Sequence, residues 1–143
     1  MEYKGVGIRF VAQIVDGIIF FVFFFIVGSI IAGSAGGATE NGFELHGGPA
    51  FLLMFLETAF IVGYFTLLEA KWNGQSLGKK VVGIQVVRED GLPIDLNAAL
   101  IRNILRIVDG FAFYLVAAIF VWTSDRKQRL GDRIAHTVVV KRR

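Results

Sequence analysis

The sequence predicts an all-α integral membrane protein with two transmembrane helices, a further segment that re-enters or crosses the membrane, and a small cytoplasmic β element. Three observations predict this class. Apolar residues make up 55% of the 143 residues, charged residues only 19%, and the mean hydropathy is +0.61. Two apolar runs have membrane length, and Lys and Arg gather in alternate connecting segments. A soluble domain of this size could not bury so much apolar surface, so we expect one membrane domain over residues 1–143.

The first predicted span runs from Phe10 to about Ala32 and has five Phe residues at its centre. At about 1.5 Å per residue it can cross a hydrocarbon core of about 30 Å. Lys4 and Arg9 before the run also fit a signal peptide, but Asp16 interrupts the apolar sequence. We therefore expect a retained helix.

The second predicted span covers Ala50 to Leu68, between Pro49 and Glu69. Its one charged residue, Glu57, lies near the middle. A carboxyl group at that depth must be protonated, paired with Arg102 or Arg106, or exposed to a water-filled cavity. A cation site and a protonated hydrogen bond between helices both remain open.

The third apolar run, Asn97 to Thr123, is interrupted by charge. Arg102 and Arg106 lie in its first half, and the purely apolar second half has only eleven residues. Three full spans would put the basic tail outside, against the positive-inside rule. A re-entrant hairpin that breaks at Gly110 avoids this conflict and is favoured, with a full third span as the alternative.

The β element is predicted at about residues 79–88 and 137–141. Val82, Ile84 and Val86 alternate with other residues before a turn at Glu89 to Gly91, and a second β-like run closes the chain. Isolated strands leave backbone groups unpaired, so the two strands are expected to pair on one side of the membrane.

Flanking charge predicts the orientation in a cell membrane. The segment at residues 33–49 has no Lys or Arg, whereas the N-terminus, the segment after the second span and the tail after Thr123 are all basic. The positive-inside rule places those three basic segments in the cytoplasm.

A ten-residue repeat carries the candidate site. Residues 8–17, IRFVAQIVDG, and residues 101–110, IRNILRIVDG, share six positions. Ionisable residues in or near lipid are expensive and often functional. In the first copy Arg9, Gln13 and Asp16 fall on one helical stripe, and a cation from the second copy, Arg102 or Arg106, is expected to pair with Asp16. Asp109 is the equivalent acid of the second copy.

This cluster of charges has two readings. It can handle protons or cations, or it can be a structural Arg–Asp lock between helices. The predicted set of ion-binding or buried charged residues consists of Arg9, Gln13, Asp16, Glu57, Arg102, Arg106, Asp109 and Asp132.

Other chemistries find little support in the sequence. There is no Cys, and His46 and His136 are solitary, so we expect no metal site and no cofactor. GQSLGKK at residues 74–80 lacks the spacing of a phosphate loop and is interpreted as a tight turn with a basic interfacial edge. No nucleophile arrangement indicates an enzyme, and no basic-aromatic pattern indicates nucleic acid.

The chain resembles the RDD family of membrane proteins, named for one arginine and two aspartates. Arg9 and Asp16 match the first two, and the SLGKKVVGIQVV stretch and the RN-x-x-R run also fit. The second aspartate is Asp109 or Asp132; Asp132 is favoured because residues 128–140 resemble the family's C-terminal pattern. His136 departs from it, where Gly is expected before the Thr.

Some members of this family have been proposed to exchange sodium or related cations for protons. The resemblance therefore implies a small secondary transporter for Na⁺, Li⁺ or K⁺ and H⁺. We expect a homo-oligomer, because so few spans cannot shield the acids from lipid. The alternative is a non-catalytic membrane module that docks a partner or stabilises an assembly.

Overall fold

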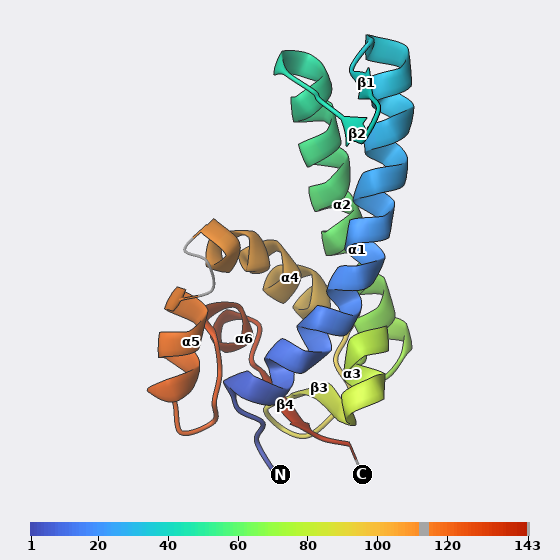
Figure 1. Ribbon diagram of the computed structural model, residues 1–143. Helices are drawn as coiled ribbons and strands as arrows, with labels where there is room; N and C mark the ends of the chain where they lie inside the picture. The colour runs from blue at the N-terminus through green and yellow to red at the C-terminus, as the bar shows by residue number, and fades with distance from the viewer. Residues whose placement is uncertain (112–114, 143) are drawn as a thin grey trace. The chain divides into compact units, whose positions relative to one another are not determined.

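The structure is a computed structural model that describes residues 1–111 and 115–142 (Figure 1). It divides into two compact units. The hairpin unit comprises residues 17–61, and the α/β unit comprises residues 1–16 and 62–143. The first helix, α1 (Val6–Ala35), and the second, α2 (Gly47–Lys71), each contribute one part to both units.

In the hairpin unit, α1 and α2 lie side by side (Figure 1). They are joined through a short antiparallel pair, β1 (Ala38–Thr39) and β2 (Gly42–Phe43). The rings of Phe23 and Phe60 stack with centroids 3.9 Å apart. A Cβ atom at Gly28 would lie 2.1 Å from the ring of Phe43, so glycine is needed for this close packing.

Both helices have the length and hydropathy of membrane spans. Their most apolar windows have mean hydropathies of 2.7 and 2.0, and they are 30 and 25 residues long. Side chains such as Phe21 and Phe51 are about two-thirds or more exposed in the chain alone (67% and 72%). Exposed aromatic surface of this kind requires lipid or protein to cover it. The protein is therefore a membrane protein with two candidate spans, both slightly longer than the sequence predicts.

The third apolar run forms two helices, α4 (Leu96–Phe111) and α5 (Leu115–Trp122), which run in different directions (Figure 1). At 1.5 Å per residue they are about 24 Å and 12 Å long, and neither alone crosses a hydrocarbon core. Gly110, the predicted break, is still helical. The predicted out-going helix begins at Phe111, and residues 112–114 of it lie outside the described residues.

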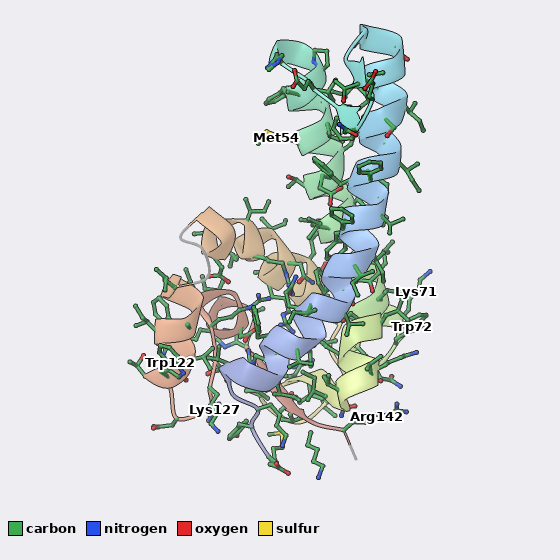
Figure 2. The ribbon with its side chains drawn as sticks, in the orientation of Figure 1. Met54, Lys71, Trp72, Trp122, Lys127 and Arg142 are labelled. Carbon is green, nitrogen blue, oxygen red and sulfur yellow. The ribbon has the colours of Figure 1, made fainter. Side chains whose placement is uncertain are left out.

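Helix α4 is amphipathic, but it buries its charged face and exposes its apolar face. Arg102, Asn103 and Arg106 are buried inside the α/β unit, whereas Ile104 and Val108 are exposed. On α5, Trp122 also points outward and is 72% exposed (Figure 2). The second copy of the repeat therefore turns its charges inward and its apolar side chains outward.

The predicted strands pair as β3 (Ile84–Arg88) and β4 (Thr137–Lys141), antiparallel, with Val86 opposite Val139. The backbone of Tyr3 adds a bridge to Val140. The first predicted strand begins too early, because residues 77–82 form a short helix, α3 (Leu77–Val82). Ser76 caps its start and Gly83 ends it in the left-handed conformation (φ 70°), which explains why strand pairing begins only at Ile84.

The core of the α/β unit lies between this sheet and the helices around it. Its buried apolar residues come from α1, β3, α4, β4 and the segment before α4; they are Ala12, Ile84, Val86, Ile94, Ala99 and Val139. The last helix, α6 (Leu130–Ile134), precedes β4 and packs against α4. This packing fixes the side chains of α1, α4 and α6 that form the site.

Candidate functional site

Asp132, on α6, is the acceptor for three arginines. Arg9 Nη1 lies 2.7 Å from Asp132 Oδ2, and Arg102 Nη2 lies 2.9 Å from Asp132 Oδ1. Arg129 Nε approaches Oδ1 at 3.4 Å. Asp132 is completely buried; burial alone would raise its pKa, but the three guanidinium groups hold that pKa well below its usual range. The carboxylate therefore stays ionised.

Glu69, at the end of α2, is the second buried acceptor. It forms an ion pair with Lys79 of α3, and its Oε2 accepts a 3.0 Å hydrogen bond from Asn103 Nδ2. Arg102 Nη1 lies 3.6 Å from the same oxygen. Arg102 thus lies between Asp132 and Glu69 and connects α2, α4 and α6.

Arg106 joins the two copies of the repeat. Its Nη1 donates a 2.8 Å hydrogen bond to Oε1 of Gln13, which occupies the equivalent position in the first copy. Its guanidinium carbon lies 3.7 Å from the centre of the Phe65 ring, an arrangement favourable for a cation–π interaction. Arg9 and Arg102 are also equivalent positions, and both bind Asp132. The two copies are therefore in contact, as the sequence predicts.

Within the described part of the chain Asp16 forms no ion pair with an arginine, and this part of the prediction is wrong. Its carboxylate accepts hydrogen bonds from Tyr64 Oη (2.8 Å), Ser76 Oγ (2.6 Å) and the backbone N–H of Gly78 (2.8 Å). The reason is that α3 packs its first turn directly against α1. Three donors satisfy the buried charge without a cation.

Asp109 and Glu57 have fewer close polar contacts than the other acids. Asp109 is fully buried, and its Oδ2 lies 3.8 Å from Arg129 Nε. Within the described residues, neither oxygen of Asp109 receives a hydrogen bond, and neither does Glu57 Oε2. Glu57 belongs to the hairpin unit, whereas the other seven predicted residues belong to the α/β unit.

A cavity of about 60 Å³ lies inside the α/β unit among these groups. Its lining includes charged and polar residues of α1, α3 and α4 and one residue next to α6. They are Arg9, Gln13, Asp16, Lys79, Arg102, Arg106 and Arg129. We refer to the buried charged residues around this cavity as the charge cluster: these six charged residues together with Glu69, Asp109 and Asp132.

Sequence reasoning missed Glu69, Lys79, Asn103 and Arg129 as members of the site. The sequence marks Glu69 only as the residue after the second span, and Lys79 only as part of a basic interfacial edge. Two short motifs contain missed residues: Lys79 lies in the SLGKK stretch beside Gly78, and Asn103 lies in the RN-x-x-R run beside Arg102. Glu69 and Arg129 lie outside both motifs. What no spacing could show is that α3 turns Lys79 inward towards α2.

Fold and site together define a class: a membrane protein with two apolar helices and a small α/β unit that encloses a buried charge cluster. The sequence profile of the RDD family matches residues 3–136. The chain is 32% identical over 150 aligned residues to "Uncharacterized protein YxaI" of Bacillus subtilis (strain 168), with 95% of each chain covered. The chain therefore belongs to the RDD family.

A second relative, "Uncharacterized protein YckC" of the same organism, is 32% identical over 90 residues, which is 60% of this chain and 59% of that protein. No solved structure matches. Neither name describes an activity, so a functional proposal must rest on the residues of the site.

Proposed function

We propose that this protein is a small secondary transporter that couples proton transfer to the movement of a monovalent ion. The proton-carrying group in this proposal is the buried pair of Lys79 and Glu69. The exchange of Na⁺, Li⁺ or K⁺ for protons, which the family resemblance implies, is the first form to be tested. The observation that carries the proposal is a buried ammonium group at the edge of a cavity.

Lys79 has the properties that a proton carrier needs. Its side chain is only 8% exposed. The pKa of Lys79 is lowered to about 7, first because burial disfavours its charged form; Arg102 and Arg106 act in the same direction, and Glu69 opposes them. A group with this pKa gains and loses a proton near neutral pH. The ordinary lysine pKa of about 10.4 would not allow this exchange.

We also propose that both termini and the segment between α2 and α4 face the cytoplasm, with two membrane crossings. Backbone hydrogen bonds support a common side: Lys4 N–H donates to Val139 O at 2.9 Å, and Lys141 N–H donates to Glu2 O at 3.0 Å. Strands β3 and β4 pair in the same unit. Segments joined in this way cannot lie on opposite faces of a bilayer.

A homo-oligomer belongs to the same proposal. Two helices expose apolar surface around most of their circumference, and Glu57 Oε2 is buried without a hydrogen bond in the described residues. A second copy packed along α1 and α2 would shield this acid from lipid. Chemical crosslinking in native membranes tests this part separately from transport.

The second candidate function is a non-catalytic membrane module. Its support is that Asp132 is held by three arginines, so the cluster also fastens α1, α4 and α6 together. Buried ion pairs often serve specificity of structure rather than chemistry. A module of this kind would need the cluster for folding and would move no ions.

A transport assay distinguishes the two candidate functions. It uses purified full-length protein in lipid vesicles that contain a pH-sensitive dye. Pulses of NaCl, LiCl and KCl should change the internal pH in protein-containing vesicles only. Pulses of sodium gluconate and choline chloride then show whether the cation or the anion drives the change. Glu57→Gln keeps the shape and hydrogen-bonding capacity of the side chain but removes its titration, so loss of activity in this variant would place a second proton site there. A wild-type protein that moves no protons with any of these salts would end the transporter proposal and leave the module.

A further inference from the structure

The charge cluster contains more positive than negative groups. Its cations are Arg9, Lys79, Arg102, Arg106 and Arg129, and its acids are Asp16, Glu69, Asp109 and Asp132. Five cations against four acids leave one positive charge when all are ionised. An unbalanced charge inside a protein is costly, so a further negative charge would stabilise this arrangement.

The excess of cations over acids is larger in the lining of the cavity than in the whole charge cluster. All five cations line it, but among the described residues of its lining Asp16 is the single acid. Asp16 already accepts three hydrogen bonds, with at least one on each carboxylate oxygen. The lining therefore offers donors rather than free acceptors, which disfavours an alkali cation inside this cavity.

Arg102 supplies a second, independent observation. It lines the cavity and is only 1% exposed, yet its Nε makes no hydrogen bond within the described residues. Its Nη1 lies 3.6 Å from Glu69 Oε2, beyond normal hydrogen-bond length. Buried donors are almost always satisfied in proteins, so this guanidinium group requires an acceptor that the described residues do not supply.

We propose that the cavity binds one small monovalent anion, of the size of chloride or nitrate, held by Arg102 and the neighbouring cations. This inference rests on the proposed function: the anion is the ion that moves with the proton. A volume of about 60 Å³ holds no more than about two water molecules, so it suits such an anion and excludes a large one such as gluconate.

Binding of the anion and protonation of Lys79 are expected to favour each other. A protonated Lys79 adds one positive charge to the lining, so the anion binds more tightly when Lys79 is protonated. The groups that face Lys79 are Glu69 on α2 and the two arginines of α4, Arg102 and Arg106. The affinity for the anion is therefore expected to rise as the pH falls from 8 to 6. Coupling of this kind leads to symport of an anion with a proton.

The test is calorimetric titration of the purified full-length protein in detergent with sodium chloride, choline chloride and sodium gluconate. We expect one chloride per chain, the same affinity with either cation, no binding of gluconate, and tighter binding at pH 6 than at pH 8. Absence of chloride binding, or heat that follows the cation rather than the anion, would overturn the inference.

Variants locate the anion. Lys79→Met and Arg106→Gln each remove one cavity cation and should weaken chloride binding about tenfold or more, because one charge-assisted contact is lost. Arg126→Gln removes an exposed cation outside the cavity and should bind as the wild type does. Their melting curves in sodium gluconate show which variants are folded. Unchanged affinity in a folded cavity variant would place the anion elsewhere and refute the assignment.

The vesicle assay distinguishes this inference from the transporter proposal. Chloride binding in detergent without proton movement in vesicles would refute transport and leave the anion site in place. Proton movement that follows alkali cations and is the same with chloride and gluconate would leave transport in place and refute the anion inference.

Discussion

Ion pairs join the residues of the charge cluster in groups of two or three, and Arg102 has the most central position. It reaches Asp132 at 2.9 Å and Glu69 at 3.6 Å, so one guanidinium group connects two buried acids. The sequence predicts Arg9, Arg102 and Asp132 as members of one network. It does not predict that Asp132, rather than Asp16, is the carboxylate that the arginines share.

The ionisation of Asp132 predicts sensitivity to acid. Because its pKa is well below the usual value in the folded protein, its ionised form contributes stability that is fully present above about pH 4 and is lost as the pH falls further. Asp132→Asn removes the negative charge that three arginines share and should cost about 3 to 5 kcal/mol at pH 6. Its melting temperature in detergent should then fall less steeply towards pH 3 than that of the wild type.

The exposed Asp125 provides the control for this experiment. Asp125→Asn should melt as the wild type does throughout the pH range, since no ion pair of Asp125 is present in the described structure. Parallel pH curves for the wild type and Asp132→Asn would show that Asp132 does not contribute to acid sensitivity.

At the level of elements, the close contact of α3 with α1 explains the GQSLGKK segment. Ser76 and the backbone N–H of Gly78 both donate to Asp16. A Cβ atom at Gly78 would lie 2.0 Å from the carbonyl oxygen of Ala12, so only glycine allows this approach. The segment interpreted from the sequence as a basic turn is thus a docking helix for α1.

Gly78→Ala is expected to destabilise the protein by about 1 to 3 kcal/mol, because backbone atoms cannot move aside as a side chain can. Gly63→Ala is the matched control: Gly63 is also helical, and a Cβ atom there would meet nothing within 4 Å. That control should be neutral or slightly stabilising. Equal melting temperatures for the two variants in detergent would contradict the close contact.

Elements with a simple period were predictable, and elements shaped by tertiary contact were not. Two long apolar runs gave α1 and α2, and alternation from Ile84 onwards gave β3. Helix α3 has only six residues, too few for a periodic signal, and depends on the cap at Ser76. Helix α4 has apolar residues all along its length, and only the fold decides that Arg102 and Arg106 point inward.

For the whole molecule, the proposed topology places the N-terminus, α3 to β3 and the C-terminal tail on the cytoplasmic side. The absence of native Cys makes this testable with single introduced thiols. Asn41→Cys, between α1 and α2, should react with an impermeant thiol reagent in intact cells. Asp125→Cys should react only after the cells are permeabilised. Labelling of both positions in intact cells would require a third crossing.

In the proposed mechanism, Lys79 carries a proton inside the charge cluster. The most direct test of this role compares Lys79→Arg with Lys80→Arg in the vesicle assay. Arginine keeps the positive charge beside Glu69 but does not release a proton at physiological pH. Lys80 is exposed on the same short helix, with its Nζ 3.5 Å from the centre of the Trp72 ring, so its replacement controls for the chemical change.

We expect Lys79→Arg to remain folded and to lose ion-driven proton movement, while Lys80→Arg keeps the wild-type rate. Lys79→Met, which has no titrating group, should also be inactive and shows that the loss does not come from the size of arginine. Wild-type proton movement in either folded Lys79 variant would contradict the claim.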